Sequence, residues 1–174
     1  AAPAYPATNV AAGRQAGAPG LALLARATLI DAYLADGRTE EAERELHAAI
    51  REQPEAPLWR MYLGRLYARG HRVDEAVAQF QVVADRQPTS SEPLIAIVEA
   101  WTLAGNREQA RSAAERLIER HGSSLQTLLV QGNAQSRFGD LAQAEAAYRK
   151  ALADHPKEPV AVISLANVLA AHER

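Results

Sequence analysis

The 174-residue chain contains no cysteine, few aromatic residues and no strong excess of either charge. The absence of cysteine excludes disulfides and thiolate metal sites. A formal net charge of -2 opposes nucleic-acid binding, which needs Lys and Arg clustered on a basic domain. Aromatic residues make up 5% of the chain and hydrophobic residues 48%, so the core must consist mainly of Ala, Leu and Val.

Long apolar segments are absent as well. The richest segment, residues 21–35, contains Arg26 and Asp31 and is shorter than the roughly 20 residues that a transmembrane helix needs. We therefore expect no direct membrane insertion. The chain does not begin with Met, and no secretion signal is visible at its start. Its abundance of Ala and Arg is typical of GC-rich bacterial genomes, so we expect a protein of the bacterial cytoplasm or periplasm, with the compartment left open.

What the sequence does contain is a repeat of 34 residues. Ala recurs at positions 42, 76, 110 and 144, and Pro or Gly follows in the same phase at positions 54, 88, 122 and 156. This period is the length of a helix-turn-helix unit that cannot bury its apolar face alone, so successive units must stack. The sequence therefore predicts an all-α fold, a right-handed α-solenoid of antiparallel helix pairs with four full repeats and one further helix.

The repeats are expected near residues 21–54, 55–88, 89–122 and 123–156, followed by a final helix at 158–172. Glycines separate the paired helices, where chain reversal needs a permissive residue: Gly37, Gly70, Gly105 and Gly139. Residues 1–20, rich in Ala, Pro and Gly, are expected to form an arm or linker. The alternative is a degenerate helix of a preceding repeat over residues 8–18.

The second and fourth units share a residue pattern that carries a family resemblance. The second unit has Trp59, Leu63, Gly64, Tyr67, Ala76, Phe80 and Pro88, and the fourth has Leu128, Gly132, Ala144, Tyr148, Ala151 and Pro156. This succession of large, small, aromatic, Ala, aromatic and Pro resembles the tetratricopeptide repeat (TPR) family over residues 21–172. The small residues lie where the two helices of a unit cross, and they permit the close approach that ridge-into-groove packing needs.

Three departures from the family pattern are visible. Trp59 stands one place early, Ala114 replaces a bulky residue, and the usually apolar places 131 and 135 hold Gln131 and Gln135. A buried Gln must find hydrogen-bond partners or cost about 1–3 kcal/mol. We therefore predict a looser interface between the third and fourth units.

The resemblance implies that the first helix of each unit lines a concave groove for a protein or peptide ligand. One row spaced by 34 residues predicts an apolar stripe along it: Ala27, Met61, Ile95, Leu129 and Ile163. Four places later runs a polar row, Asp31, Arg65, Glu99, Asn133 and Asn167, and one turn further lie Arg69 and Arg137. Such parallel tracks suit an amphipathic helix or an extended peptide. The alternative is that the apolar row packs between neighbouring first helices.

Some TPR domains hold a C-terminal carboxylate with a clamp of basic and Asn side chains. The resemblance places Ala27, Asp31, Tyr62, Glu92 and Ala96 at the clamp positions, and these groups cannot hold a carboxylate. No nucleophile motif, phosphate loop or metal-spaced histidine group appears, so we expect no enzymatic activity, metal or cofactor.

The sequence thus predicts a non-enzymatic scaffold that docks a peptide or protein segment. The last helix, with Val160, Val162 and Ile163, is apolar on several sides, whereas solenoids normally end in a polar cap. We therefore expect a segment of a larger bacterial protein, or self-association through the ends. The alternative function is a structural spacer or self-assembling segment of a cell-envelope or exopolysaccharide-export apparatus.

Overall fold

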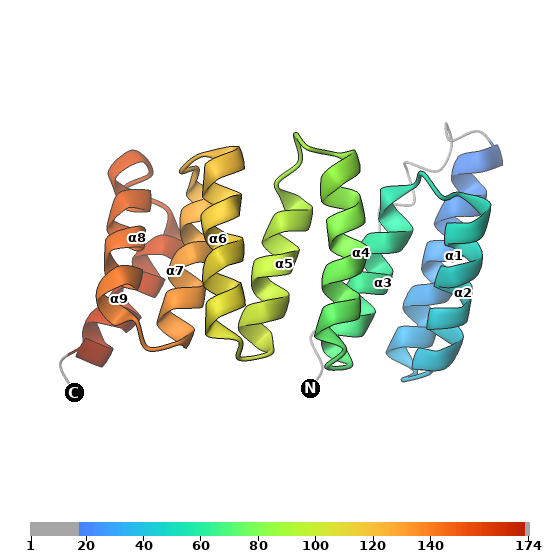
Figure 1. Ribbon diagram of the computed structural model, residues 1–174, viewed down its shortest axis with the longest axis horizontal. Helices are drawn as coiled ribbons and strands as arrows, with labels where there is room; N and C mark the ends of the chain where they lie inside the picture. The colour runs from blue at the N-terminus through green and yellow to red at the C-terminus, as the bar shows by residue number, and fades with distance from the viewer. Residues whose placement is uncertain (1–17, 173–174) are drawn as a thin grey trace.

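The computed structural model describes residues 18–172, so the predicted arm lies outside the described residues except at its last positions, as does the alternative helix at 8–18 except at its last residue. The described residues form nine helices and no strand (Figure 1). In chain order they are α1 (Ala18–Ala35), α2 (Thr39–Glu52), α3 (Pro57–Arg69), α4 (Val73–Arg86), α5 (Glu92–Leu103), α6 (Arg107–His121), α7 (Leu125–Arg137), α8 (Leu141–Asp154) and α9 (Pro159–His172). The predicted all-α solenoid of four helix pairs and one further helix is confirmed.

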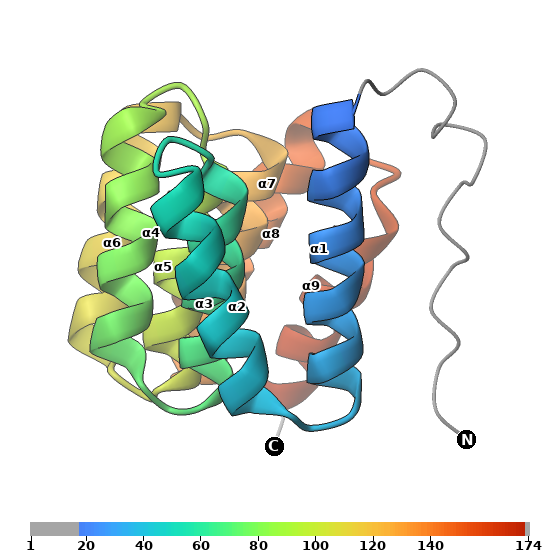
Figure 2. The same cartoon turned by 90° about the vertical axis from the view of Figure 1, so that its right-hand side faces the viewer.

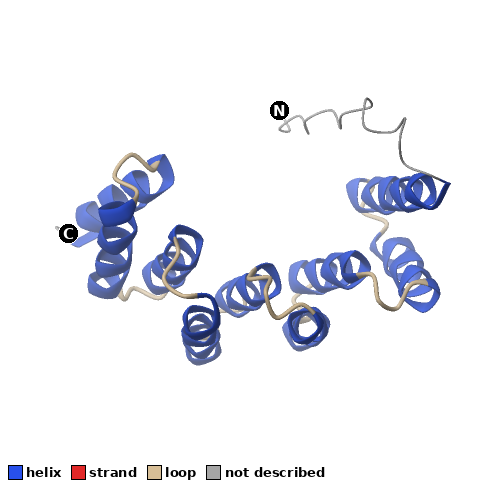
Figure 3. Cartoon of the chain, turned by 90° about the horizontal axis from the view of Figure 1, so that it is seen from above, coloured by secondary structure: helices blue, strands red, loops and turns tan. Residues whose placement is uncertain are grey.

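The helix pairs follow an arc when the molecule is seen from above (Figure 3). Figure 2 shows α4 and α6 on one side of the molecule and α1 and α9 on the other, with α3, α5 and α7 between them. The ends of the arc bend away from the second helices, so its inner side is lined by first helices. From α3 onward each first helix also packs against the next first helix, whereas α1 makes no comparable contact with α3 in the described part of the chain.

The two helices of a unit cross at a glycine in the second and fourth units. A Cβ added at Gly64 would overlap the Phe80 ring, and one added at Gly132 would lie 2.6 Å from Cε1 of Tyr148. Both rings are buried, with 1% and 2% of their surface exposed. The absence of a side chain on the first helix is therefore what makes room for the aromatic ring of the second.

At the same crossing, the first and third units carry side chains of other sizes. In the third unit the equivalent positions hold Val98 and Ala114, so the larger residue has moved to the first helix. In the first unit they hold Ile30 and Leu46, and both are fully buried. Two large residues at one crossing keep the helices apart. This explains why α1 and α2 pack less extensively than the other three pairs.

The core is interrupted between the third and fourth units. One large cluster of buried residues extends from Ile30 on α1 to Leu117 on α6, and Ala134 is its only fully buried member on α7. The last three helices hold two smaller clusters, one around Leu128 and one around Tyr148. Contacts of α6 with α7 are, with those of α2 with α3, the least extensive between consecutive units. The loosening predicted at this junction is present between α6 and α7, but α5 and α7 contact each other more extensively than other neighbouring first helices, so the junction of the first two units is the weaker one overall.

The four predicted glycines all lie in the turns inside the units. Gly37, Gly105 and Gly139 have φ of 72°, 74° and 80°, a left-handed conformation that favours glycine. Gly70 follows the last residue of α3 with φ of -81°, and the left-handed residue of this turn is His71 with φ of 60°. Position 71 is the one in phase with the other three turns.

The crossing predicts a compensating pair of substitutions. Gly64→Val should lower the free energy of unfolding by about 1–3 kcal/mol, because its side chain would overlap the Phe80 ring. Phe80→Ala should cost about 3–5 kcal/mol through the cavity it leaves. The double variant reproduces the Val98 and Ala114 pair. Its free energy of unfolding should fall by clearly less than the sum of the losses in the two single variants. Urea denaturation followed by circular dichroism measures the free energy of unfolding of the wild type, the two single variants and the double variant. Additive losses would contradict the size-compensation argument.

Candidate inner groove

A pocket of about 190 Å³ lies on the inner side of the arc between α5 and α7. Its lining comes from these two first helices alone: Val98, Glu99, Thr102, Leu103, Val130, Asn133, Ala134 and Arg137. We call it the inner pocket. Three of the residues predicted to bind a partner, Glu99, Asn133 and Arg137, meet here. The spacing of three and four residues on each helix places their side chains on one face.

Local sequence fixes where these two helices begin. Pro93 occupies the first turn of α5, where the missing N–H costs nothing. At α7, Oγ of Ser124 accepts a hydrogen bond from the Thr127 N–H at 3.3 Å, while the Thr127 hydroxyl donates to the Gly122 carbonyl at 2.8 Å. Because Thr127 is only 1% exposed, these bonds anchor the start of α7 in the core and set the phase of its groove-facing residues.

Hydrogen bonds orient two of the polar side chains of the inner pocket. The Tyr148 hydroxyl of α8 donates to Oδ1 of Asn133 at 2.7 Å, and Nε of Arg137 donates to the Thr102 carbonyl at 3.2 Å. The second bond joins α7 to α5 across the pocket. Both groups are thus held in place before a ligand arrives, which lowers the entropy cost of binding.

Glu99 is the negative group of the inner pocket. Desolvation by its surroundings raises the pKa of this carboxyl, and the Arg65 guanidinium opposes the shift only in part. Arg65 is itself engaged, because its NH2 donates to Oε1 of Glu92 at 2.8 Å. A carboxylate that is poorly compensated by its neighbours attracts a basic group of a ligand.

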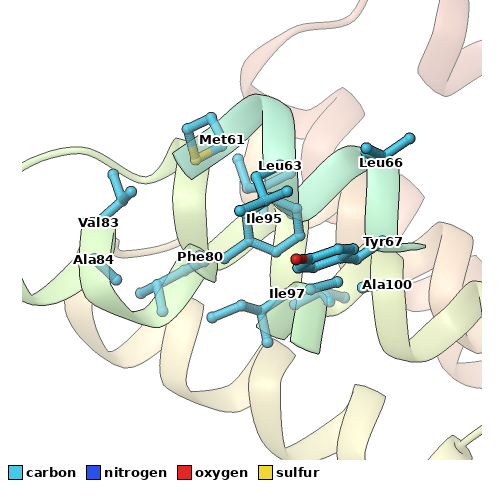
Figure 4. Close-up of a cluster of buried hydrophobic side chains, with 14 of the residues drawn as sticks. Met61, Leu63, Leu66, Tyr67, Phe80, Val83, Ala84, Ile95, Ile97 and Ala100 are labelled. Carbon is cyan, nitrogen blue, oxygen red and sulfur yellow. The ribbon is translucent and has the colours of Figure 1, made fainter. Parts of the chain in front are cut away.

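The apolar stripe is not a continuous groove surface. Met61 and Ile95 are only 5% and 7% exposed, and Figure 4 shows them among the buried side chains of α3, α4 and α5. The prediction that Met61 and Ile95 anchor a partner directly is wrong, because both side chains pack into the core. This agrees with the alternative that the apolar row packs between neighbouring first helices. Leu129 is half-buried against the smaller clusters, and Ile163 is 60% exposed on α9.

The remaining predicted residues are exposed but lie outside the inner pocket. Arg65 is on α3 and Asn167 is on α9. Arg69 lines a separate cavity with Leu34 and Tyr67, beside the turn between α1 and α2. The structure therefore brings together three of the seven polar groove residues and distributes the others along the arc.

Sequence reasoning missed the apolar part of the inner pocket. Leu103 is 51% exposed, and Val130 is half-buried beside it in the lining. Leu103 occupies the periodic position at which the second and fourth units carry Arg69 and Arg137. The first and fifth units hold Ala35 and Ala171 at this position, so the row has no uniform character and gave no signal for a ligand contact at Leu103.

Two structural findings bear on other kinds of site. Within residues 18–172, no group of three or more His, Asp or Glu side chains is placed to hold a metal ion. None of the helices in this part of the chain combines the length and the apolar character needed to cross a membrane.

Comparison with known families identifies the fold independently. The model of the family described as Tetratricopeptide repeat matches residues 27–91, 104–159 and 129–174. The protein therefore belongs to the tetratricopeptide repeat family. Members of this family are in general non-enzymatic, and binding to other proteins is typical of them.

The chain is similar to parts of much longer bacterial proteins. It is 32% identical over 126 residues to a probable biofilm formation methyltransferase of Pseudomonas putida, covering 72% of this chain and 28% of that protein. It is 27% identical over 122 residues to a putative cellulose synthase operon protein C of Escherichia coli, covering 70% of this chain and 11% of that protein. The chain thus spans less than a third of the length of these relatives.

Solved structures share the fold at low sequence identity. A thermophilic TPR protein of Thermus thermophilus matches with a TM-score of 0.64 and 21% identity, covering 86% of this chain and 82% of that one. The first TPR of Spaghetti, bound to an HSP90 peptide, matches with a TM-score of 0.56 and 19% identity, covering 68% of this chain and 94% of that one.

The shifted pKa of Glu99 predicts a pH-dependent stability. A raised pKa means that the folded state favours the protonated carboxyl, so this contribution to stability is present below the ordinary glutamate pKa and is lost as the pH rises through the raised value. Glu99→Gln should therefore be more stable than the wild type at pH 7, and the difference should vanish below about pH 4. Thermal melts between about pH 4 and pH 7 measure the difference in stability between the variant and the wild type. The exposed Glu119→Gln is the control for the loss of one charge. A constant difference at every pH would contradict the prediction.

Proposed function

We propose that this protein is a scaffold without enzymatic activity that docks a segment of a partner protein in the inner groove, at the pocket between α5 and α7. The observation that carries the proposal is the composition of the inner pocket. Glu99 and Arg137 lie beside the apolar surface of Leu103 and Val130, inside an arc that is lined by first helices. The HSP90 peptide bound by the TPR of Spaghetti supports peptide binding as a use of this fold.

The lining indicates the chemistry of the docked segment. An apolar side chain fits against Leu103 and Val130, a basic side chain fits next to Glu99, and a carboxylate or carbonyl group fits next to Arg137. An amphipathic helix or an extended peptide supplies such groups at regular spacing. A terminal carboxylate clamp is not part of this proposal, because Asp31 and Glu92 occupy positions where cations would be needed.

We also propose that this chain catalyses no reaction. The methyltransferase of Pseudomonas putida is matched over only 28% of its length, and the aligned region covers 72% of this chain. The inner pocket holds a single carboxylate, Glu99, and no nucleophile paired with a base. We propose that the similarity to this relative concerns a TPR region with a binding function.

Groove binding is tested with peptides selected against the whole chain from a random library. Selected peptides should combine apolar, basic and acidic residues, and Leu103→Glu and Arg137→Glu should each weaken their binding at least about tenfold, which corresponds to roughly 1.4 kcal/mol. Arg120→Glu, an exposed change on α6, is the matched control. Selected peptides whose binding ignores Leu103 and Arg137 would oppose the proposal. Ile95→Asp is unsuitable as a test, because this buried side chain is needed for folding.

A second candidate function rests on the two ends of the solenoid. Large apolar side chains are exposed on both terminal helices: Leu21 at 49%, Leu24 at 52% and Leu29 at 42% on α1, and Val160 at 52%, Val162 at 46% and Ile163 at 60% on α9. Exposed apolar surface that gathers in patches marks interaction sites. In this alternative the chain is a structural spacer or self-assembling segment of a cell-envelope or polysaccharide-export apparatus, and the similarity to cellulose synthase operon protein C favours it.

The second candidate predicts association that depends on concentration. Sedimentation equilibrium of the wild type should show an increasing average mass with increasing concentration, and replacing Val162 and Ile163 by Lys should return a monomer, because both side chains are exposed. Circular dichroism controls for folding. A wild type that stays monomeric at the highest attainable concentration opposes self-assembly and leaves the groove as the functional surface.

A further inference from the structure

A second hollow region of the surface lies between α6 and α8, over α7, on the side of the second helices. Two adjoining cavities of about 270 and 410 Å³ share Gln131, Gln135 and Gln143 in their linings. Figure 1 shows α7 between α6 and α8. We call the two cavities together the outer cleft. The outer cleft is separate from the inner pocket, although Ala134 borders both.

The outer cleft exists because an aromatic side chain is missing from the repeat pattern. The positions equivalent to Gln135 in the first three units hold Tyr33, Tyr67 and Trp101. In the second unit the Tyr67 ring is 5% exposed, lies 4.0 Å below the Arg72 guanidinium, and donates its hydroxyl proton to Oε1 of Glu43 at 2.9 Å. In the fourth unit an amide stands in place of the ring, and Ala114 on α6 adds further space.

The amide that replaces the ring has an unmet hydrogen-bonding requirement. Nε2 of Gln135 donates to Oε1 of Gln143 over a long distance of 3.4 Å. Its own Oε1 is buried and has no partner among the described residues. A buried acceptor without a donor is unfavourable. A ligand that fills the cleft therefore gains most if it brings an N–H or O–H group to this oxygen.

The cavity of about 270 Å³ in the outer cleft presents charges that are already paired. NH1 of Arg107 donates to Oδ1 of Asp140 at 3.1 Å, and Nε of Arg111 donates to Oε1 of Glu115 at 2.9 Å. Arg107 also donates to the Phe138 carbonyl and lies 5.7 Å from the ring centre of Phe138. With its ionic groups matched to each other, the rim of this cavity favours a neutral, planar ligand over a free ion.

We propose that the outer cleft docks a tyrosine or tryptophan side chain of a partner polypeptide, whose O–H or N–H donates to Oε1 of Gln135. The inserted ring takes the place that Tyr67 and Trp101 fill in the preceding units. Tyr and Trp combine a large apolar surface with one donor, as this cavity requires. The site is independent of the inner groove and gives the scaffold a second docking surface on its opposite side.

The test uses the whole chain, labelled with nitrogen-15, and four neutral probes in nuclear magnetic resonance titrations. N-acetyl-tyrosinamide and N-acetyl-tryptophanamide should shift the side-chain amide signals of Gln135 and Gln143 with saturation. N-acetyl-phenylalaninamide, which has the ring without the side-chain donor, should bind about fivefold more weakly. N-acetyl-leucinamide should bind more weakly still. Absence of saturable shifts at residues 131–143 with all probes up to about 10 mM would overturn the proposal and leave water as the occupant.

Two variants and a matched control locate the binding. Gln135→Trp restores the ring that the third unit carries, so it should abolish probe binding and raise the melting temperature. Gln135→Leu keeps the space and removes the acceptor, so it should retain ring binding while losing the preference for tyrosine over phenylalanine. Gln126→Trp, an exposed change on the same helix, should leave binding unchanged. Probe binding that survives Gln135→Trp, or a tyrosine preference that survives Gln135→Leu, would also overturn the proposal.

Discussion

The structure depends on how closely the two helices of a unit approach each other where they cross. A fixed volume is available there, and the residue on the first helix limits the residue on the second. Gly64 accommodates Phe80, Gly132 accommodates Tyr148, and Val98 faces the place of Ala114. Where Ile30 and Leu46 are both large, the pair packs less extensively, and α1 contacts α3 less than the later first helices contact each other. The looser packing of the first unit is consistent with this excess of volume.

The same crossing positions the inner pocket. Tyr148 is brought against α7 by the space at Gly132, and its hydroxyl then orients Asn133 through a 2.7 Å hydrogen bond. The polar lining of the groove is therefore coupled to the packing of the helix behind it. This is a physical reason why a binding surface on such a solenoid is rigid even though it is formed by side chains of separate helices.

The period of 34 residues allowed the fold to be predicted well, because it identifies equivalent positions and a helix pair cannot bury its apolar face alone. It could not fix the direction in which a row of equivalent side chains points. The row of Met61 and Ile95 predicts groove residues, but both side chains lie in the core. The repeat pattern does not predict that Leu103 and Val130 line the inner pocket. The breaks in the pattern were more informative than the pattern itself: Gln131 and Gln135 marked the loose junction from the sequence alone. The looser packing of α1 against α2 could be predicted only by comparing the sizes of Ile30 and Leu46 across the turn, and a single row does not show this.

The interruption of the core between α6 and α7 has a consequence for the energetics of the stack. The stability of a solenoid is approximately the sum of the stabilities of its units and of the contacts between neighbours. Because α6 and α7 share fewer contacts than α4 and α5 or α8 and α9, the contact of α5 with α7 on the inner side carries more of the attachment between the third and fourth units. The inner pocket is lined by these same two helices, so the candidate binding surface is built on the contact that holds the two units together.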